Sequence, residues 1–322
     1  MKTTAFRWAI APAAFAVAVG LTACGGQAQT AGGSGTSGKG ALSGEILLDG
    51  SSTVAPLSSA AGELFKQKNP GVNVSVQTSG TGGGFKKFCA GQTDISNASR
   101  PIKDAEKEQC KAAGIEFQEI VVANDALSIV VGKGNTFLQC LTKAELKTLW
   151  AKPATGTVTS WKQVNPSFPD APIKLYGPGT DSGTFDYFTE AINGKAGDSR
   201  TDYSPSEDDN VIVKGVSGDV NALGYFGLSY LEENTGSLRA VKVDGGAGCV
   251  EPSIASAQDG TYMPLSRPLF IYVSKKAAAK PAVKAFVQFY VETDEAITKA
   301  AKFVPLNAEQ KAKATAEVKA LG

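Results

Sequence analysis

The sequence predicts an α/β protein with a mostly parallel sheet, and three observations support this. Short apolar segments, loops rich in Gly and Ser, and amphipathic segments follow one another repeatedly along the chain. Glycine supplies 36 of 322 residues, against an average of about 7%, which is typical of tight turns rather than of a helical bundle. A hydrophobic fraction of 42% is ordinary for a globular protein and excludes disorder throughout.

The N-terminus has the features of an export signal. Lys2 and Arg7 precede an uncharged, mostly apolar run from Trp8 to Leu21, which is too short for a comfortable membrane span. The run ends in Leu21-Thr22-Ala23-Cys24, which resembles a bacterial lipobox and implies cleavage before Cys24 and lipidation of its thiol. We therefore expect a lipoprotein signal peptide at 1–23, the alternative being an ordinary signal peptide with a chance cysteine. A flexible Gly/Ser tether is expected at 24–43.

The first part of the chain predicts alternating strands and helices. Apolar residues at 57, 60, 61, 64 and 65 have helical spacing after Pro56, whereas Val72, Val74 and Val76 alternate as in a strand. In order, the expected elements are a strand at 45–48, a helix from about 56, a strand at 72–76, a short helix carrying 85–89, a strand from 94, a charged helix at 104–113 and a strand at 115–123.

A second unit of the same kind follows an apolar run at 127–132. Thr142-Lys143-Ala144-Glu145 is a capping box that starts a helix through Trp150. The later elements are a strand at 173–176, a helix carrying 185, 188 and 192, a helix at 217–223, strands at 238–243 and 268–273, and a closing helix from 281 whose buried face extends to 297.

Three expected strand ends open into loops rich in Ser, Thr and Gly. They are Gly50–Thr53, Thr78–Gly84 and Gly179–Thr184, and helices follow them. The first N–H groups of a helix lack internal partners and carry the positive end of the helix dipole, so such loops bind anions. One loop alone is explained by helix capping, but three together predict a site for a tetrahedral oxyanion.

Several other functions are excluded or disfavoured by composition. The chain has no histidine, which excludes Ser-His-Asp and Cys-His catalysis and His-ligated zinc. It has no Gly-Lys-Ser/Thr P-loop, and Phe85 stands where a dinucleotide fingerprint needs its last glycine. A net charge of +1 argues against a nucleic-acid-binding protein. We expect no catalytic residue, metal or cofactor.

At these loops the chain resembles the phosphate-binding proteins of bacterial ABC phosphate importers. The resemblance covers about 44–306, and its residues are Gly50–Pro56, Ser79–Gly82, Asp94–Arg100, Thr180–Phe185 and Ala222–Tyr225. It implies a two-lobed periplasmic-binding-protein fold of type II, in which each lobe is a mixed, mostly parallel sheet flanked by helices, with two hinge strands. It also implies capture of inorganic phosphate and delivery to the permease and ATPase of an importer by a monomer anchored through Cys24 on the extracytoplasmic face of the cell membrane.

The resemblance also assigns phosphate ligands. Those carried over by motif are Ser52, Thr53, Val54, Ser79, Ser182, Gly183 and Thr184. In one branch of the family an aspartate accepts the ligand proton where this chain has Arg100, and an arginine lies near the position of Pro178. The charges are thus expected to have changed lobes, with Arg100 as the cation and Asp181 as the acid.

The implied lobes suggest a pairing of the cysteines. Apart from Cys24, four cysteines allow three pairings, and the absence of a CxxC motif disfavours a redox or zinc site. The resemblance places lobe one at 44–126 and 264–322 and lobe two at 127–263. Cys89–Cys110 and Cys140–Cys249 are then favoured, because each pair lies within one lobe and leaves the hinge free.

Three alternatives remain open from the sequence. The first is a binding protein for another oxyanion, such as sulfate, molybdate or tungstate. The second is an exported hydrolase using Ser182 or Ser52, although no G-x-S-x-G motif is present. The third is a surface adhesin or anion sensor that works without an importer.

Overall fold

The computed structural model describes residues 42–180, 182–206 and 208–322. The lipobox cysteine Cys24 and the expected signal peptide lie outside these residues, as does Asp181. Among the described residues, no helix is both long and apolar enough to cross a membrane.

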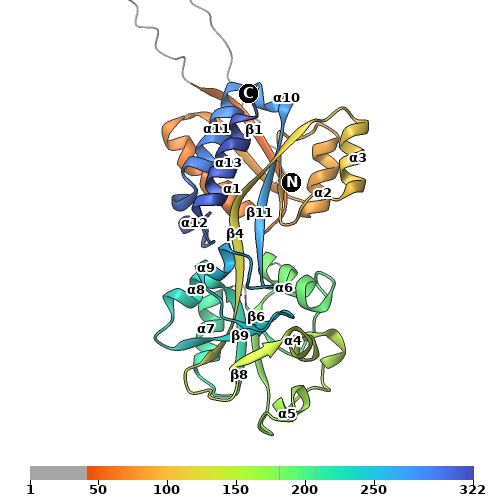
Figure 1. Cartoon of the computed structure of the whole chain (residues 1–322), viewed down its shortest axis with the longest axis vertical. Helices are drawn as coiled ribbons and strands as arrows, with labels where there is room; N and C mark the ends of the chain where they lie inside the picture. The colour runs from red at the N-terminus through yellow and green to blue at the C-terminus, as the bar shows by residue number, and fades with distance from the viewer. Residues whose placement is uncertain (1–41, 181, 207) are drawn as a thin grey trace, which may run out of the picture. The chain divides into compact units, whose positions relative to one another are not determined.

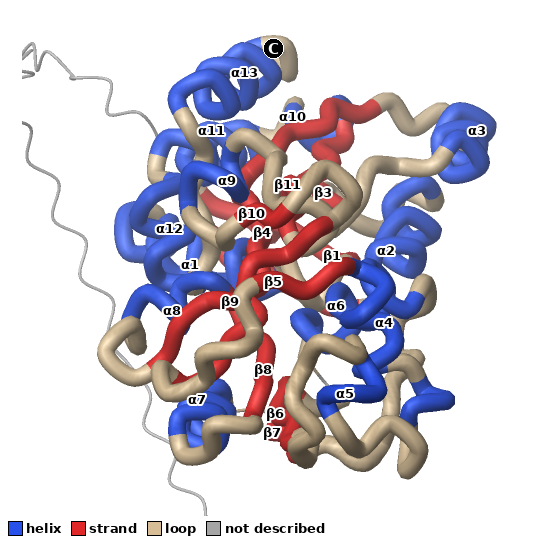
Figure 2. The backbone as a smooth tube through the Cα atoms, turned by 60° about the horizontal axis from the view of Figure 1, so that its bottom comes forward, coloured by secondary structure: helices blue, strands red, loops and turns tan. Residues whose placement is uncertain are grey.

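The strands of the described chain join into one sheet (Figures 1 and 2). In chain order they are β1 (Ser43–Gly50), β2 (Gly71–Thr78), β3 (Ile95–Ala98), β4 (Phe117–Gly132), β5 (Cys140–Thr142), β6 (Lys174–Pro178), β7 (Ser204–Ser206), β8 (Ala222–Gly227), β9 (Leu238–Asp244), β10 (Cys249–Val250) and β11 (Ser266–Ser274). The main path runs β2-β1-β3-β11-β4-β8-β6-β7. Off this path, β9 pairs with β4, and β5 and β10 pair with β9.

Helices flank the strands (Figure 2). The longer ones, of eight residues or more, are α1 (Ala55–Lys68), α2 (Gly80–Cys89), α3 (Asp104–Ala112), α4 (Lys143–Trp150), α6 (Gly183–Asn193), α7 (Asp209–Ser217), α11 (Pro281–Glu292), α12 (Asp294–Ala301) and α13 (Ala308–Lys319). The short ones are the 3₁₀ turn η1 (Lys152–Ala154), α5 (Trp161–Val164), α8 (Leu228–Glu233), α9 (Ile254–Gln258) and α10 (Lys275–Ala278).

Separate hydrophobic cores define two lobes. In lobe one, β1–β3 and the adjoining parts of β4 and β11 pack against α1–α3 and α10–α13, with Phe65 against Phe286 at 5.5 Å between ring centroids. In lobe two, β5–β10 and the rest of β4 pack against α4–α9, where Tyr225 stacks on Phe188 at 3.9 Å. Burying each such ring contributes about 1.5–3 kcal/mol, so each lobe has its own source of stability.

Two long strands connect the lobes. β4 and β11 run antiparallel from Ser274↔Phe117 to Ser266↔Ala126, and β4 then continues in lobe two, where Leu127 pairs with Gly227 of β8 (Figure 1). The hinge thus consists of two paired strands. The sheet is mixed rather than mostly parallel: β1 pairs parallel with β2 and β3, and β6 with β7 and β8, whereas the long strands β4 and β11 pair antiparallel with their neighbours.

Three expected elements were wrong in detail. The strand at 115–123 and the apolar run at 127–132 form one 16-residue strand, β4. The helix at 217–223 does not exist, because α7 ends at Ser217 and the buried run from Ala222 joins the sheet as β8. The closing helix is divided into α11 and α12, with Thr293 between them.

Two glycines of lobe one, Gly50 and Gly84, are required by close backbone contacts. Gly50, at the end of β1, has φ +141°, and a Cβ there would lie 2.1 Å from the Asn97 carbonyl oxygen. Gly84 of α2 packs on Gly50, since a Cβ at 84 would lie 2.5 Å from the Gly50 Cα. These contacts explain why a glycine-rich segment is helical from Gly80: close packing compensates for its low helix propensity.

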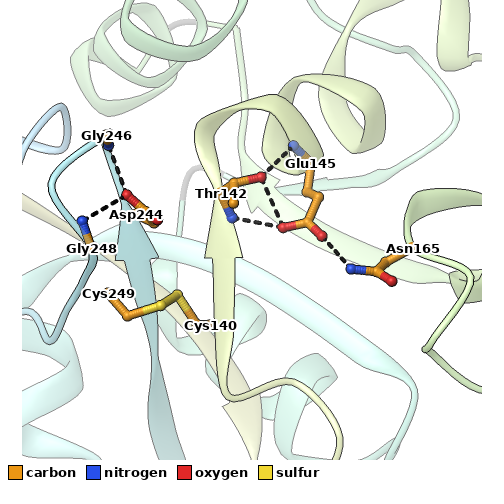
Figure 3. Close-up of a disulfide and its surroundings, with 8 residues drawn as sticks. All are labelled: Cys140, Thr142, Glu145, Asn165, Asp244, Gly246, Gly248 and Cys249. Carbon is orange, nitrogen blue, oxygen red and sulfur yellow. Dashed lines mark hydrogen bonds between the residues drawn. A yellow bond between two sulfur atoms is a disulfide. The ribbon is translucent and has the colours of Figure 1, made fainter.

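The two expected disulfides are confirmed. Cys89 of α2 is joined to Cys110 of α3 in lobe one, and Cys140 of β5 to Cys249 of β10 in lobe two. Figure 3 shows the second bond beside the expected capping box, in which Thr142 Oγ1 accepts from Glu145 N at 3.1 Å. Neither bond joins one lobe to the other, so neither prevents hinge motion.

Candidate functional site

Two adjoining cavities lie where the lobes meet the hinge, and Ser52 and Thr53 line both. The first, of about 210 Å³, receives Gly80–Gly82, Ser99 and Arg100 from lobe one, α6 residues from lobe two, and Arg267 from β11. The second, of about 430 Å³, is lined by Asp125 and by Ser182–Thr184. The first is smaller than the roughly 300–1,000 Å³ of pockets for drug-sized ligands, so it suits an ion or another very small molecule.

The N-terminus of α6 faces Thr53 across the lobes. A Cβ at Gly183 would lie 2.8 Å from Thr53 Oγ1 and 3.1 Å from Thr53 N, so only glycine permits this approach. Ser182 caps the helix, its Oγ accepting from Thr184 N at 3.2 Å. The structure therefore brings together the first and third of the loops predicted to bind an anion, with a helix dipole directed at their junction.

Two more of the expected ligands, Val54 and Ser79, do not direct their side chains into either cavity. Val54 has its side chain buried in the core of lobe one, so only its backbone can face a ligand. Ser79 donates its hydroxyl to Asp49 Oδ1 at 2.7 Å and its N–H to Gly50 O at 3.1 Å. Both donors of Ser79 are engaged, and it is not among the residues that line either cavity.

Asp49 is the buried residue that holds Ser79. It also accepts a hydrogen bond from Lys87 of α2. Burial by itself raises the pKa of Asp49, but the hydrogen bonds from Lys87 and Ser79 outweigh burial and hold that pKa below its ordinary value. Asp49 is therefore a charged anchor for the second loop. Next to Ser79, Thr81 lines the first cavity and is hydrogen-bonded to Ser99 Oγ at 3.1 Å.

Arg100 lines the first cavity and is ion-paired with Glu106 of α3. Nη1 and Nη2 donate to the two carboxylate oxygens at 2.9 and 2.8 Å, and Nη1 also reaches Pro101 O. This hydrogen bonding raises the pKa of Arg100, while burial opposes the rise. Nε has no hydrogen bond to another described residue, and Nη2 has a second N–H besides the one that it donates to Glu106, so these two groups can still donate to an anion.

Arg267 is a second cation in the first cavity, and the sequence analysis missed it. Its guanidinium lies 3.5 Å from the centroid of the Tyr187 ring, and Nη2 donates to Thr53 Oγ1 at 3.3 Å. Nε and Nη2 both reach Asp125 Oδ2 at 3.4 Å. Arg267 belongs to no local motif. The available signal was its place three residues after the expected lobe boundary at 264, close to the hinge.

Carboxylates also face the site. Asp125 is buried, which raises its pKa, although the nearby Arg267 opposes the rise. Asp186 and Glu190 of α6 line the first cavity opposite Arg100. Burial and the charge of Glu190 raise the pKa of Asp186. The described residues contain no group of three or more His, Cys, Asp or Glu side chains that could hold a metal ion.

The chain matches known proteins over most of its length. Residues 30–295 match the model of the PBP superfamily domain. Protein SphX of Synechococcus elongatus is 49% identical over 271 residues, 84% of this chain and 80% of SphX. The phosphate-binding protein PstS of Staphylococcus saprophyticus is 43% identical over 288 residues, 89% of this chain and 86% of PstS.

Solved structures are similar as well. A possible phosphate-binding protein from Planctomyces limnophilus has a TM-score of 0.83 and 45% identity, covering 87% of this chain and 99% of that one. A putative phosphate ABC transporter substrate-binding protein with bound phosphate from Clostridium perfringens has a TM-score of 0.57 and 28% identity, covering 82% of this chain and all of that one. The chain therefore belongs to the PBP superfamily, in the family that includes SphX and the phosphate-binding protein PstS.

Proposed function

We propose that this protein captures inorganic phosphate between its lobes and delivers it to an ABC importer. The observation that carries the proposal is the first cavity, which combines two arginines, several hydroxyls and a nearby helix N-terminus in a volume of about 210 Å³. Charge-assisted donors of this kind are what a small, doubly charged oxyanion needs. The relatives named for phosphate binding support the same ligand.

The proposed ligand set joins the predicted residues with one from the hinge. Ser52, Thr53, Ser182, Gly183 and Thr184 supply hydroxyl and backbone donors, Val54 supplies its backbone N–H, and Arg100 and Arg267 supply charge. Ser79 contributes by shaping the second loop from its bonds to Asp49 and Gly50. We retain Asp181 as the acceptor of the ligand proton on the sequence argument alone.

The cellular setting is part of the proposal. The lipobox ending at Cys24 supports a lipid anchor on the extracytoplasmic face of the membrane. The resemblance to phosphate-binding proteins of ABC importers supports a permease and an ATPase as partners of a monomeric binding protein. Replacing Cys24 with alanine should release the protein from the membrane fraction. Retention of the Ala variant in that fraction would contradict lipid anchoring.

Calorimetry with a panel of oxyanions tests the proposed ligand. A chain beginning at Ala41, just before the first described residue, should bind phosphate and arsenate and should not bind sulfate or molybdate. Tighter binding of sulfate, molybdate or tungstate than of phosphate would indicate a binding protein for that other oxyanion. Release of phosphate from a model ester would support the hydrolase, and a gene neighbourhood without permease and ATPase genes would support a sensor or adhesin.

A further inference from the structure

Arg267 and Tyr187 form a contact between the hinge and lobe two, where the Tyr187 ring also packs in the hydrophobic core. Arg267 is on β11, and Tyr187 is on the second turn of α6, with the guanidinium 3.5 Å from the ring centroid. The Tyr187 hydroxyl also donates to Pro264 O at 2.9 Å, just before β11 begins. Helix α6 is thus attached to the hinge segment at two points, three residues apart.

The same guanidinium reaches lobe one. Its Nη2 donates to Thr53 Oγ1 at 3.3 Å, in the loop that precedes α1, and its Nε and Nη2 face Asp125 at 3.4 Å. One planar side chain, 14% exposed, therefore contacts both lobes and the neighbouring hinge strand. Each of these polar contacts is longer than the usual 2.7–2.9 Å of charge-assisted hydrogen bonds, so the cation is held loosely by the protein alone.

An anion beside Thr53 would complete the coordination of Arg267. The bound anion would hold the guanidinium in one position. Tyr187 stacks on the face of the same guanidinium. A cation is attracted to the face of an aromatic ring when it lies within about 6 Å of the ring centroid, so the Tyr187 ring favours the position in which it lies over the guanidinium. Fixing Arg267 therefore also fixes α6, whose N-terminus completes the anion site through Ser182–Thr184.

We propose that Arg267 and Tyr187 act as a clasp that couples anion binding to closure of lobe two, with Tyr187 as a positioning residue. This inference rests on the proposed function, because phosphate is the anion that would engage the clasp. It makes one distinctive prediction. Loss of the Tyr187 ring should mainly speed the release of phosphate, because the proposal places the contact between Arg267 and Tyr187 in the closed state and not in the open state.

Stopped-flow and calorimetric measurements with inorganic phosphate on the full-length protein test the clasp. Tyr187→Leu should weaken binding about 3- to 30-fold, through a faster dissociation rate with little change in the association rate. Tyr187→Phe keeps the ring and should restore most of the affinity. Phe168→Leu removes a partly buried ring that packs on Trp161 at the core of lobe two; it is the control for lost packing and should leave phosphate release unchanged.

Arg267→Lys provides a second variant that does not depend on the packing of Tyr187. It keeps the charge but loses the planar face, so it should also speed phosphate release and reduce the compaction on phosphate binding seen by small-angle X-ray scattering. Dissociation rates equal to wild type in both Tyr187→Leu and Arg267→Lys would overturn the clasp and leave the proposed function standing. Failure of the wild-type protein to bind phosphate would overturn both.

Discussion

Arg267 lies directly opposite Asp125 in the pairing of the two hinge strands, and their side chains meet at 3.4 Å. The pair is placed where β4 and β11 pass from one lobe to the other, beside Thr53. Because burying the carboxylate is costly, which is why its pKa is raised, the pair adds little to stability. Its main effect is to hold a cation at the wall of the anion cavity.

Replacing Arg100 tests the cation that the sequence predicted. Arg100→Ala should weaken phosphate binding at least about tenfold, because a charge-assisted contact to an anion contributes about 1.5–3 kcal/mol. Lys107→Ala is a matched control, since it removes the same charge from the exposed side of α3, where Lys107 pairs with Asp104. Equal dissociation constants for Arg100→Ala and wild type would show that Arg100 does not bind phosphate and serves only in the ion pair with Glu106.

Replacing Asp181 tests discrimination between phosphate and sulfate. Near neutral pH phosphate keeps a proton that a carboxylate can accept, whereas sulfate presents only lone pairs that repel the carboxylate. Asp181→Asn should therefore weaken phosphate binding and let sulfate compete, because an amide can donate. Competition calorimetry measures both effects. If the Asn variant binds phosphate normally in a large excess of sulfate, the proton acceptor is another acid, and Asp125 and Asp186 are the next candidates.

Gly183 is the position where a single methyl group should block closure. A Cβ there would lie 2.8 Å from Thr53 Oγ1 and 3.1 Å from its backbone nitrogen. Gly183→Ala should weaken phosphate binding by more than about tenfold with no loss of free energy of unfolding, because alanine suits a helix better than glycine does. The control is Gly236→Ala, where a Cβ would meet nothing within 4 Å. Normal phosphate affinity in the Gly183 variant would mean that the bound state does not need this contact.

The two disulfides should differ in their contribution to stability. They close loops with separations of 21 and 109 residues, and in the chain-entropy model the longer loop stabilises by roughly 1.5 kcal/mol more. Replacing Cys140 and Cys249 by serine should therefore lower the free energy of unfolding in urea more than replacing Cys89 and Cys110. Phosphate affinity should stay the same in both variants, because each bond lies within one lobe. A large affinity loss in either would indicate that the bond supports the site.

The sequence was a good guide wherever the determinants are local. The helix starts at Pro56 and Thr142, the strand at 72–76 and the Ser/Thr/Gly loops depend on neighbouring residues, and the structure has all of them. Arg267 was missed because its partners Thr53, Asp125 and Tyr187 are 80 to 214 residues away, and no spacing rule links them. For Ser79 the loop was identified correctly, but its bond to Asp49 depends on the packing of β1 beside α2.

The central claim is that phosphate is held beside Thr53 between Arg100 and Arg267. Titration calorimetry of phosphate into the double variant Arg100→Ala/Arg267→Ala, beside wild type, tests it most directly. Lys107→Ala/Lys276→Ala is the control with equal charge. We expect saturable one-to-one binding in wild type and control, and no measurable binding in the folded double variant. Phosphate binding of wild-type strength in the double variant would contradict the account.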